Sequence, residues 1–408
     1  MYAVALQAIF IAMLLGIVLQ AVHMVYNIRS ILGDMREIET RASGRNSGKG
    51  YQAIIPCRIS SSSPEEVGYT IDSIERSLGA GVIDRAIIVT EPGETKSLER
   101  LGRYGDKVEI LESLEGICRK CSGKNKAILT ALKAIEGSGG DVVILLDCDA
   151  HHNPETLWYA LRASHAMGVI VTGYRWYTLR DIYSVLYNMV SSIAFEHMGI
   201  WRTRIIWGGL VAIPSHILRS MGLWERLSEE LSDDAVMGSE ARRRGYRFIF
   251  CRRCISPTPA QRSIASFYRW AVRQMVILRL YTPLGFKILM AIYSIGTIFM
   301  ITLPASLIAV KTIPEAQLVA LVSACYIAIG SIRGAIAIWL YSPHRIYRGS
   351  PPGDERIIWR LVYIALAGVR APLILAILIS ATRTRRFSWR GTEYCIENRR
   401  AVPCRAIV

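Results

Sequence analysis

Long apolar segments near both ends of the chain constrain its fold more than any other feature. Residues 1–28 contain no Lys, Arg, Asp or Glu and are long enough to cross about 30 Å of hydrocarbon. A cleaved secretory signal is the alternative, but this stretch is too long and lacks both a basic start and a small-residue cleavage site. We therefore expect an N-terminal transmembrane helix over residues 1–28.

Three further apolar segments reach a spanning length: Ile288–Val310, Ala316–Tyr341 and Ile357–Ala381. The second contains Arg333 and the third contains Arg360 and Arg370, while no acidic residue lies within any of the three. A buried Arg costs a few kcal/mol in a membrane unless it reaches the interface or finds a partner. Residues 287–382 are therefore expected to form two or three transmembrane helices, the last of which either crosses or lies in the interface.

The remaining chain divides by composition. Residues 51–263 contain no stretch of spanning length and are expected to form a water-soluble domain. A linker over 29–50, which ends in the small and polar GRNSGKG, precedes it. Residues 264–286 are basic and amphipathic, which favours a helix lying on a membrane. A basic tail over 383–408 completes the organisation.

The net charge of +16 bears on topology. Basic residues follow the first apolar segment directly: Arg29, Arg36, Arg41, Arg45 and Lys49. Such residues mark the cytoplasmic side, so we expect a multi-pass cell-membrane protein whose soluble domain is cytoplasmic. No nucleic-acid motif accompanies the charge, so a nucleic-acid partner is not expected. Four spans would place the Arg-rich tail outside; either the last segment does not cross, or the charge rule fails for this tail.

Nine cysteines follow no small secreted framework. Two C-x-x-C pairs, Cys118–Cys121 and Cys251–Cys254, have the ligand types of a structural zinc site. Their separation is much longer than in common zinc modules, which favours buried thiols or local disulfides. Cys395 and Cys404 would pair if the tail is extracellular.

Apolar strand patterns alternate with helical patterns in the first half of the soluble region. The expected elements are strands over 51–56, 86–90, 108–111 and 141–146, with helices over 63–78 and 124–135. This alternation predicts an α/β domain with a sheet that is parallel at least in this half. Ligands of such sheets bind at the carboxyl ends of the strands.

The segment Asp147-Cys148-Asp149 follows the buried strand DVVILL directly. Residues two apart in extended backbone point the same way, so both carboxylates can face one site. Hard oxygen ligands suit Mg or Mn, which proteins commonly share with substrate phosphates. His151 and His152 are interpreted as loop residues, since imidazole suits zinc better.

Two more motifs lie further along the chain. Ser232-Asp233-Asp234 leads into a helix that ends at Arg-Gly-Tyr. An acidic residue there stabilises a helix start, or acts as a general base that takes a proton from an attacking hydroxyl. Arg269-Trp270 opens the amphipathic helix, where Arg suits a diphosphate and Trp a sugar ring, although such a pair is equally common at a membrane interface.

In this order and spacing the motifs resemble the membrane-bound glycosyltransferases of family two and its neighbours. That group includes cellulose and hyaluronan synthases, dolichol-phosphate sugar transferases and ceramide glucosyltransferase. The pieces that carry the resemblance are the IIP strand, Glu91 after AIIVT, Gly-Lys-Asn-Lys at 123–126, DCD, Trp-Gly-Gly at 207–209, SDD…RGY and YRW. The local likeness of WGG…DD…RGY…RW is to ceramide glucosyltransferase and related lipid glycosyltransferases.

The resemblance implies a Rossmann-like GT-A fold for the soluble domain, an α-helical transmembrane domain and inverting chemistry with a Mg or Mn cation. It implies that Asp234 is the catalytic base and that Asp149 binds the metal. The implied donor-binding residues are Glu91, Lys124, Asp147, Asp149 and Arg269. The implied acceptor-binding residues are Trp207, Gly208, Asp233 and Trp270. Lys124 and Lys126 would help to hold the nucleotide, although lysines at a helix start are commonly just solvated.

Two departures from the family pattern refine this hypothesis. Glu91 stands where the family commonly has Asp, which bears on the contact with the nucleotide base. Ser266 stands where polymerising synthases have Gln, and the chain has fewer apolar segments than a polymer channel needs. A processive polysaccharide synthase is therefore the weaker enzymatic alternative.

Aromatic and apolar segments within the soluble region bear on the acceptor. Trp176–Trp201 is either a core helix or a segment at the membrane surface, and Ile264–Leu280 is expected to lie at the interface. We therefore expect transfer of glucose or mannose from UDP- or GDP-hexose to a lipid or lipid-linked glycan. A transporter or a non-catalytic membrane scaffold is the alternative of another class. A transporter would have charged residues lining several spans, of which only Arg333, Arg360 and Arg370 are present, and a scaffold would not need three acidic positions in family order.

Overall fold

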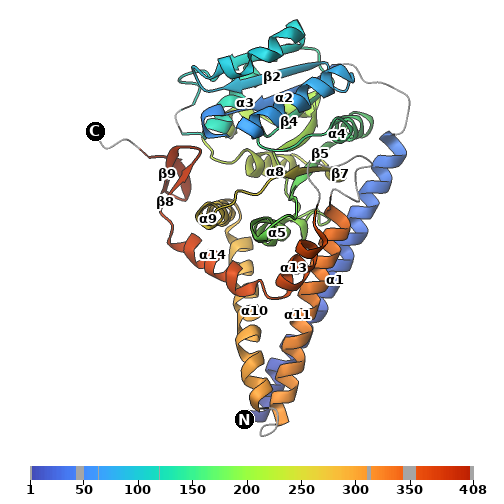
Figure 1. The fold of residues 1–408 in the computed structure, drawn as a ribbon, viewed down its shortest axis with the longest axis vertical. Coiled ribbons are helices and arrows are strands. Elements are labelled where there is room, and N and C mark those ends of the chain that lie inside the picture. Colours follow the sequence, from blue (N-terminus) through green and yellow to red (C-terminus); the bar gives the residue numbers. More distant parts are fainter. Residues whose placement is uncertain are drawn as a thin grey trace.

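A computed structural model describes residues 2–42, 50–62, 64–118, 120–309, 314–342 and 355–404 of the protein. An α/β domain lies at one end and three long helices extend away from it (Figure 1). Most of the GRNSGKG segment lies outside the described residues.

A seven-stranded sheet forms the centre of the α/β domain, with strand order β3-β2-β1-β4-β6-β5-β7. The strands are β1 Tyr51–Pro56, β2 Arg85–Thr90, β3 Val108–Glu112, β4 Val142–Leu146, β5 Ile170–Tyr177, β6 Leu210–Pro214 and β7 Phe248–Thr258. The first four are mutually parallel, as the alternating pattern predicts. β6 is antiparallel to both β4 and β5, so the whole sheet is mixed.

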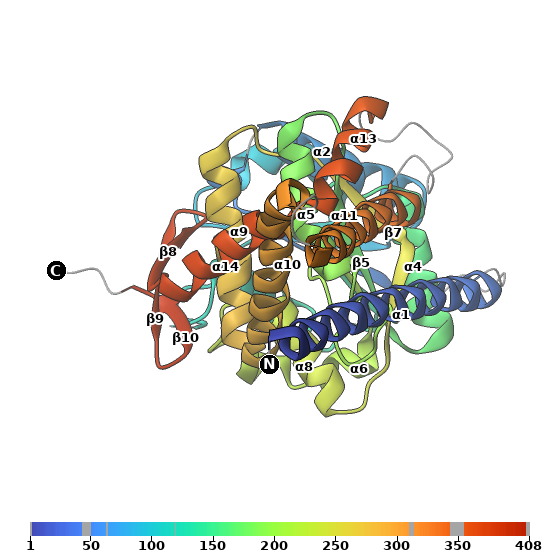
Figure 2. The same ribbon diagram turned by 90° about the horizontal axis from the view of Figure 1, so that it is seen from below.

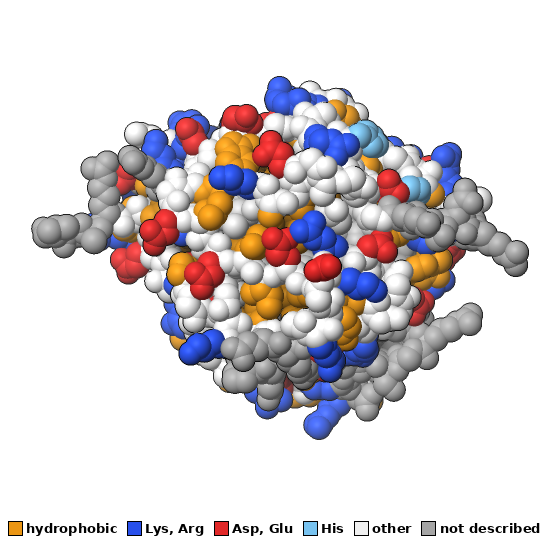
Figure 3. All heavy atoms as spheres, turned by 90° about the horizontal axis from the view of Figure 1, so that it is seen from above, with side chains coloured by type: hydrophobic (Ala, Val, Ile, Leu, Met, Phe, Trp, Pro, Cys, Tyr) orange, Lys and Arg blue, Asp and Glu red, His pale blue; other side chains and the backbone are white. Residues whose placement is uncertain are grey.

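Helices cover both faces of this sheet. They are α2 Pro64–Gly79, α3 Gly123–Ala134, α4 Pro154–Met167, α6 Ser215–Ser220, α7 Leu223–Leu227 and α8 Asp233–Arg243, with 3-10 turns η1 Ile59–Ser61 and η2 Thr95–Lys107. Because strand side chains alternate, Ala53 and Ile55 of β1 pack toward α2 and α4, whereas Ile54 packs toward α3. Seen from above, the face of the domain opposite the long helices carries charged side chains of both signs (Figure 3).

Three helices are long and apolar enough to cross a membrane: α1 Tyr2–Ala42, α10 Pro283–Ala309 and α11 Pro314–Tyr341. Their surfaces are apolar and uncovered, with Leu284 71% and Ile308 83% exposed. Such exposure is unfavourable in water and expected in lipid.

The first helix corrects one expected boundary. It continues past Ile28 to Ala42, so residues 29–42 are helical rather than a linker. The extension is held against the α/β domain, because Ile31 and Ile38 are buried and Glu39 pairs with Arg253 at 3.0 Å. The helix therefore joins the membrane segment rigidly to the sheet.

The last apolar segment is not one straight span. It forms α13 Ile357–Gly368 and α14 Ala371–Arg383, which are bent by 69°. Both ends of the pair contact the α/β domain or its flanking helix. Glu355 accepts a hydrogen bond from Trp176 Nε1 at 2.7 Å, and Arg279 donates to the carbonyl of Thr382 at 2.7 Å. The pair therefore enters and leaves on the side of the α/β domain.

This course of the chain places the basic tail beside the α/β domain. The tail forms a small antiparallel sheet of β8 Arg386–Trp389, β9 Thr392–Glu397 and β10 Arg400–Pro403. Figure 2 shows it at the side of the molecule, next to α14 and α9. If the bent pair is re-entrant, the tail stays on the side of the α/β domain, and the conflict between four spans and an Arg-rich tail does not arise.

Two helices lie between the sheet and the long helices. α5 Ile182–Phe195 is almost wholly buried, so the Trp176–Trp201 segment contains a core helix. α9 Ile264–Tyr281 leads into α10 and exposes Ile264 and Tyr268 by 58% and 42%. The interfacial position expected from its sequence stays a prediction.

The arginines of the apolar segments have acidic partners that come from other elements. Glu196, at the end of α5, pairs with both Arg333 and Arg370. Glu355 pairs with Arg360 at 2.9 Å. Sequence reasoning could not find these partners, because they lie outside the apolar segments.

Candidate active site

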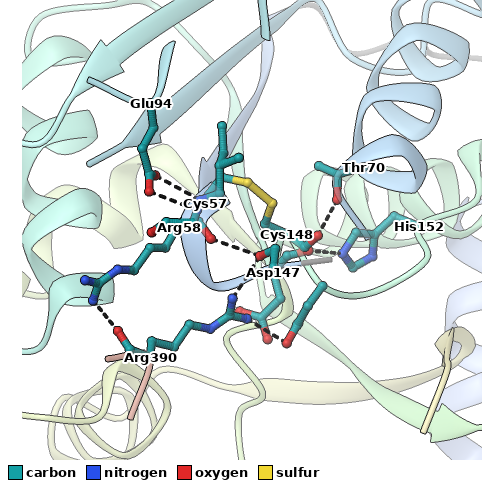
Figure 4. Close-up of a disulfide and its surroundings, with 12 residues drawn as sticks. Cys57, Arg58, Thr70, Glu94, Asp147, Cys148, His152 and Arg390 are labelled. Atoms are coloured by element: carbon teal, nitrogen blue, oxygen red, sulfur yellow. Dashed lines mark hydrogen bonds and ion pairs between the residues drawn. A yellow bond between two sulfur atoms is a disulfide. The ribbon is translucent and has the colours of Figure 1, made fainter. Parts of the chain in front are cut away.

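Two strand ends and a disulfide form the floor of the site. β1 and β4 are neighbours at the point where the strand order reverses, and their carboxyl ends are followed by Cys57 and Cys148. A disulfide joins these two cysteines (Figure 4). Thr70 donates a hydrogen bond to the Cys148 carbonyl, and His152 Nε2 lies 3.0 Å from the Asp147 carbonyl. The DCD loop is therefore held from several sides, and His152 supports it as a loop residue.

The two carboxylates of this loop point into a cluster of cations. Asp147 contacts Lys124 Nζ at 2.7 Å and Arg175 Nη2 at 2.8 Å. Asp149 contacts Arg175 at 3.3 Å and Arg390 Nη2 at 2.8 Å. The side chains come from α3, β5 and the tail, so segments far apart in sequence meet at the strand ends.

Charge decides the ionisation of these carboxylates. Burial opposes the charged form of Asp147, but Lys124 and Arg175 outweigh it and hold the pKa well below its usual range. Burial likewise opposes ionisation of Asp149, and Arg175 and Arg390 lower its pKa. Both groups are therefore anionic at neutral pH and present hard oxygens.

Lys124 joins the DCD loop to the start of α8. Ser122 caps α3 by accepting from the backbone of Asn125, which positions Lys124 in the first turn. Its amine lies 2.9 Å from Asp233 and 2.7 Å from Asp147. Burial opposes its charge, but the carboxylates raise its pKa well above the ordinary value. Lys124 is thus an enclosed bridge and not a solvated lysine.

The WGG segment lets the two acidic motifs approach each other. The backbone N–H of Gly208 donates to Asp234 Oδ1 at 2.8 Å. A Cβ at Gly208 would lie 2.0 Å from Asp233 Oδ2, and one at Gly209 would lie 2.5 Å from Asp147 Oδ2. Only glycine fits at both positions, because any side chain would displace a carboxylate.

Asp234 differs from the other acids of the site. It is the second residue of α8, whose N-terminus is capped by Ser232. Burial and the neighbouring Asp233 carboxylate raise its pKa well above the usual range, against the effect of Lys124. A carboxylate with a raised pKa is a better proton acceptor near neutral pH than an ordinary aspartate.

The structure brings most of the expected residues together. Glu91 follows β2 and lies near the start of α3, where a Cβ at Gly123 would be 3.3 Å from its carboxylate. Trp207 is only 6% exposed, and Arg175 stacks over its ring at 5.1 Å. Trp207 therefore forms a wall beneath Arg175.

The two residues of the Arg-Trp motif lie in different surroundings. Arg269 is exposed and donates to Ser266 Oγ at 3.2 Å. Trp270 packs against Tyr177 and Tyr187. Instead Arg273, one turn later on α9, interacts electrostatically with Asp149 and Arg390. The helix turns the expected Arg outward and the later one inward.

Sequence reasoning missed three arginines of the site: Arg175, Arg273 and Arg390. Arg175 had a detectable signal, since it is a charge within the otherwise apolar strand segment GYRWY. Arg273 lies four residues, or about one helical turn, after Arg269 on the same helix, so the two side chains are neighbours on its surface. Arg390 had no local signal, because it lies 241 residues from Asp149.

The donor set fits a divalent cation only if a ligand completes it. Among the described residues no group of three or more His, Cys, Asp and Glu side chains is arranged to hold a metal ion. Asp149 and Asp147 offer carboxylate oxygens, and Mg²⁺ is commonly bound by one or two carboxylates together with substrate phosphates. The residues present therefore fit a cation that arrives with a phosphorylated substrate.

Several known proteins are similar to this chain. A mannosyltransferase from Pyrobaculum calidifontis, solved in complex with GDP-Man and Mn2+, is 17% identical, with 93% of this chain and 98% of that chain covered and a TM-score of 0.44. Glucosyl-3-phosphoglycerate synthase from Mycobacterium tuberculosis, solved with phosphoglyceric acid, is 16% identical, with 60% and 82% covered and a TM-score of 0.37. No curated protein matches the sequence significantly.

The family is decided by a family model. The model described as glycosyl transferase family 21 matches residues 116–402. This range exceeds half of the chain and includes the DCD, WGG and SDD motifs together with all but the last residue of the tail sheet. The expected enzyme class is thereby confirmed, and the chain belongs to glycosyl transferase family 21.

Proposed function

We propose that the protein is an inverting glycosyltransferase that moves a hexose, glucose or mannose, from a UDP- or GDP-sugar to a lipid or lipid-linked glycan. The observation that carries the proposal is the opposition of Asp234 to the Asp147–Asp149 pair across Lys124. The Asp147–Asp149 side, with a cation, suits binding of a diphosphate, and Asp234 on the other side suits the role of proton acceptor. The site lies in the same domain that the apolar helices anchor.

Each side chain has a defined part in this proposal. Asp149, with Asp147 beside it, would hold a Mg or Mn cation, which would neutralise the charge of the diphosphate. Glu91 lies on the side of the nucleotide base. Lys124 keeps Asp147 and Asp233 at a fixed separation, with contacts of 2.7 and 2.9 Å.

Asp234 removes the proton of the attacking hydroxyl. The Gly208 N–H orients one of its oxygens at 2.8 Å, and its raised pKa gives it the basicity that the step needs. Attack from the face opposite the leaving diphosphate inverts the sugar carbon. Asp233, Trp207, Gly208 and Trp270 are proposed to border the acceptor.

The acceptor is proposed to come from the membrane. α9 and the bent α13–α14 pair expose apolar side chains below the site, among them Ile264 at 58% and Leu361 at 55%. Such surfaces bind lipid interfaces. The basic residues that follow the first span, including Arg29 and Arg36, favour a cytoplasmic active site in a multi-pass protein.

The test separates chemistry from binding. Purified protein is given a panel of nucleotide-sugars, a lipid extract and Mn²⁺, and glycolipid formation is measured. Asp234→Asn should abolish transfer, with at least a hundredfold loss of kcat, while nucleoside diphosphate binding is retained. Asp106→Asn, an exposed position far from the acidic motifs in sequence, is the control. Full transfer by the Asp234 variant would refute the assigned base.

A further inference from the structure

The tail sheet, residues 386–403, is attached to the catalytic domain at several points. Arg58 donates to the carbonyl of Arg390 and to Thr392 Oγ1, the latter at 3.3 Å. Arg400 pairs with Glu229 at 2.9 Å. Tyr394 and Ala401 are 2% and 3% exposed, where they pack on Leu231 of the domain. These contacts make the sheet part of the catalytic unit.

The sheet is rigid for its size. Its three strands are paired along their length, and a disulfide joins Cys395 to Cys404. The hairpin between β8 and β9 closes through a two-residue turn, Arg390-Gly391, with φ of 49° and 75°. Such a turn favours Asn or Gly at its first position. An Arg in this backbone conformation is unfavourable by itself, and it persists only where surrounding contacts compensate for the strain.

The Arg390 side chain reaches from this turn into the site. Its Nη2 lies 2.8 Å from Asp149 Oδ2, and its Nη1 donates to Ser62 Oγ at 3.0 Å. Figure 4 shows it extending from the tail toward the DCD loop beside Arg58. The tail thus delivers a cation to the carboxylate that is proposed to hold the metal.

Arg273 adds a second cation without a carboxylate of its own. Its Nε is buried and has no hydrogen-bond partner within the described part of the chain. Its guanidinium carbon lies 5.1 Å from the ring centroid of Trp389, on the same tail sheet. Burial and the nearby Arg390 lower the pKa of Arg273 to about 10, so the group remains charged at neutral pH. Desolvation of a partly buried guanidinium that no carboxylate of the described residues contacts directly is costly, and a bound anion would offset that cost.

We infer that the tail sheet is a lid on the donor site and that Arg390 and Arg273 bind the diphosphate of the nucleotide-sugar. The inference rests on the proposed function, because it assigns the anion from the donor's chemistry. Before the donor binds, Arg390 neutralises Asp149. With the donor and a cation bound, Asp149 would be available to the cation, and Arg390 would bind the phosphate oxygens, which suit its planar donors.

This exchange predicts two effects of opposite sign. Arg390→Gln should weaken binding of a nucleoside diphosphate with Mn²⁺ by about tenfold or more, since it removes charge-assisted hydrogen bonds. The same variant should bind Mn²⁺ alone more tightly, because Asp149 loses a competitor. Arg273→Gln should weaken diphosphate binding in the same way. Arg390→Lys should retain part of the diphosphate binding that Arg390→Gln loses. If the role of Arg390 were purely structural, Arg390→Gln would not bind Mn²⁺ more tightly.

The measurement is calorimetry on the full-length protein in detergent, with Mn²⁺ alone, then UDP or GDP with Mn²⁺, then uridine or guanosine. Arg386→Gln, an exposed position on β8 of the same sheet, is the matched control and should behave as wild type. Nucleoside binding should be unchanged in every variant.

The outcomes separate the two proposals. If wild type binds a nucleoside diphosphate and transfers sugar while Arg390→Gln and Arg273→Gln match Arg386→Gln, the lid is refuted and the proposed function stands. If wild type binds neither diphosphate and turns over no donor, the proposed function fails and the lid assignment fails with it.

Discussion

The acidic residues of this site are distinguished by their neighbours. Asp147 and Asp149 face Lys124, Arg175 and Arg390, which lower their pKa values. Asp234 faces Asp233 and the domain interior, which raise its pKa. Aspartates of one site are thereby divided into two with lowered pKa values, Asp147 and Asp149, and one with a raised pKa, Asp234. This division follows from position and not from the residues themselves.

The influence of Asp233 on Asp234 gives a pH prediction. The base acts only when it is ionised, so the rate falls as the pH drops through its raised pKa. Asp233→Asn removes the negative charge that raises this pKa, and the acid limb of the kcat–pH profile should move to lower pH. Steady-state rates at saturating donor measure the limb. A limb that stays in place or moves to higher pH would contradict the assignment.

The disulfide beneath the carboxylates gives a stability prediction. Cys57–Cys148 closes a loop of 91 residues, and Cys395–Cys404 closes one of 9. In the chain-entropy model the first contributes about 4.6 kcal/mol and the second less. Serine replacement of Cys57 and Cys148 should therefore lower the thermal unfolding midpoint more than replacement of the tail pair. Equal losses would show that loop length does not govern the effect.

At the scale of elements, local pattern predicted much of the fold. The strand over 51–56 is predicted to the residue, and the helix over 124–135 is shifted by one. β5, β6 and β7 were not predicted individually, and an antiparallel β6 between β4 and β5 is set by tertiary pairing. The end of α1 was missed because residues 29–42 alternate charged and apolar side chains, and only docking against the domain stabilises them as helix.

The bent α13–α14 pair yields a topology prediction. Single cysteines are introduced into a Cys325→Ser background at Glu136, Arg399 and Ile308, which are all exposed. A membrane-impermeant thiol reagent should label Glu136→Cys and Arg399→Cys from one side, and Ile308→Cys at the far end of α10 from the other. Labelling of Arg399→Cys with Ile308→Cys would show that the pair crosses.

Sidedness itself is decided by the same experiment in oriented vesicles. The arginines after α1 favour the cytoplasm for the catalytic domain. Its disulfides are typical of oxidising compartments and also of intracellular proteins from hyperthermophiles. If the catalytic domain is cytoplasmic, its disulfides would be of the kind found in intracellular proteins from hyperthermophiles.

For the whole molecule, membrane and catalytic parts are joined through ion pairs and buried contacts. Glu196 of the domain holds Arg333 and Arg370, and Glu39 of α1 holds Arg253 of β7 at 3.0 Å. The DCD and SDD motifs were predictable because each follows a local pattern. The cations that oppose them were not, since Arg390 reaches Asp149 only through the course of the bent pair and tail.

The proposed activity is metal-dependent sugar transfer from a nucleotide donor at the DCD loop. The most direct test measures release of UDP or GDP from the donor panel with lipid extract, in wild type and in Asp149→Asn, before and after chelation. We predict release by wild type that is lost with chelator and restored by Mn²⁺ or Mg²⁺, and a loss of at least a hundredfold in Asp149→Asn. Release that persists in Asp149→Asn and is indifferent to chelator would contradict the account.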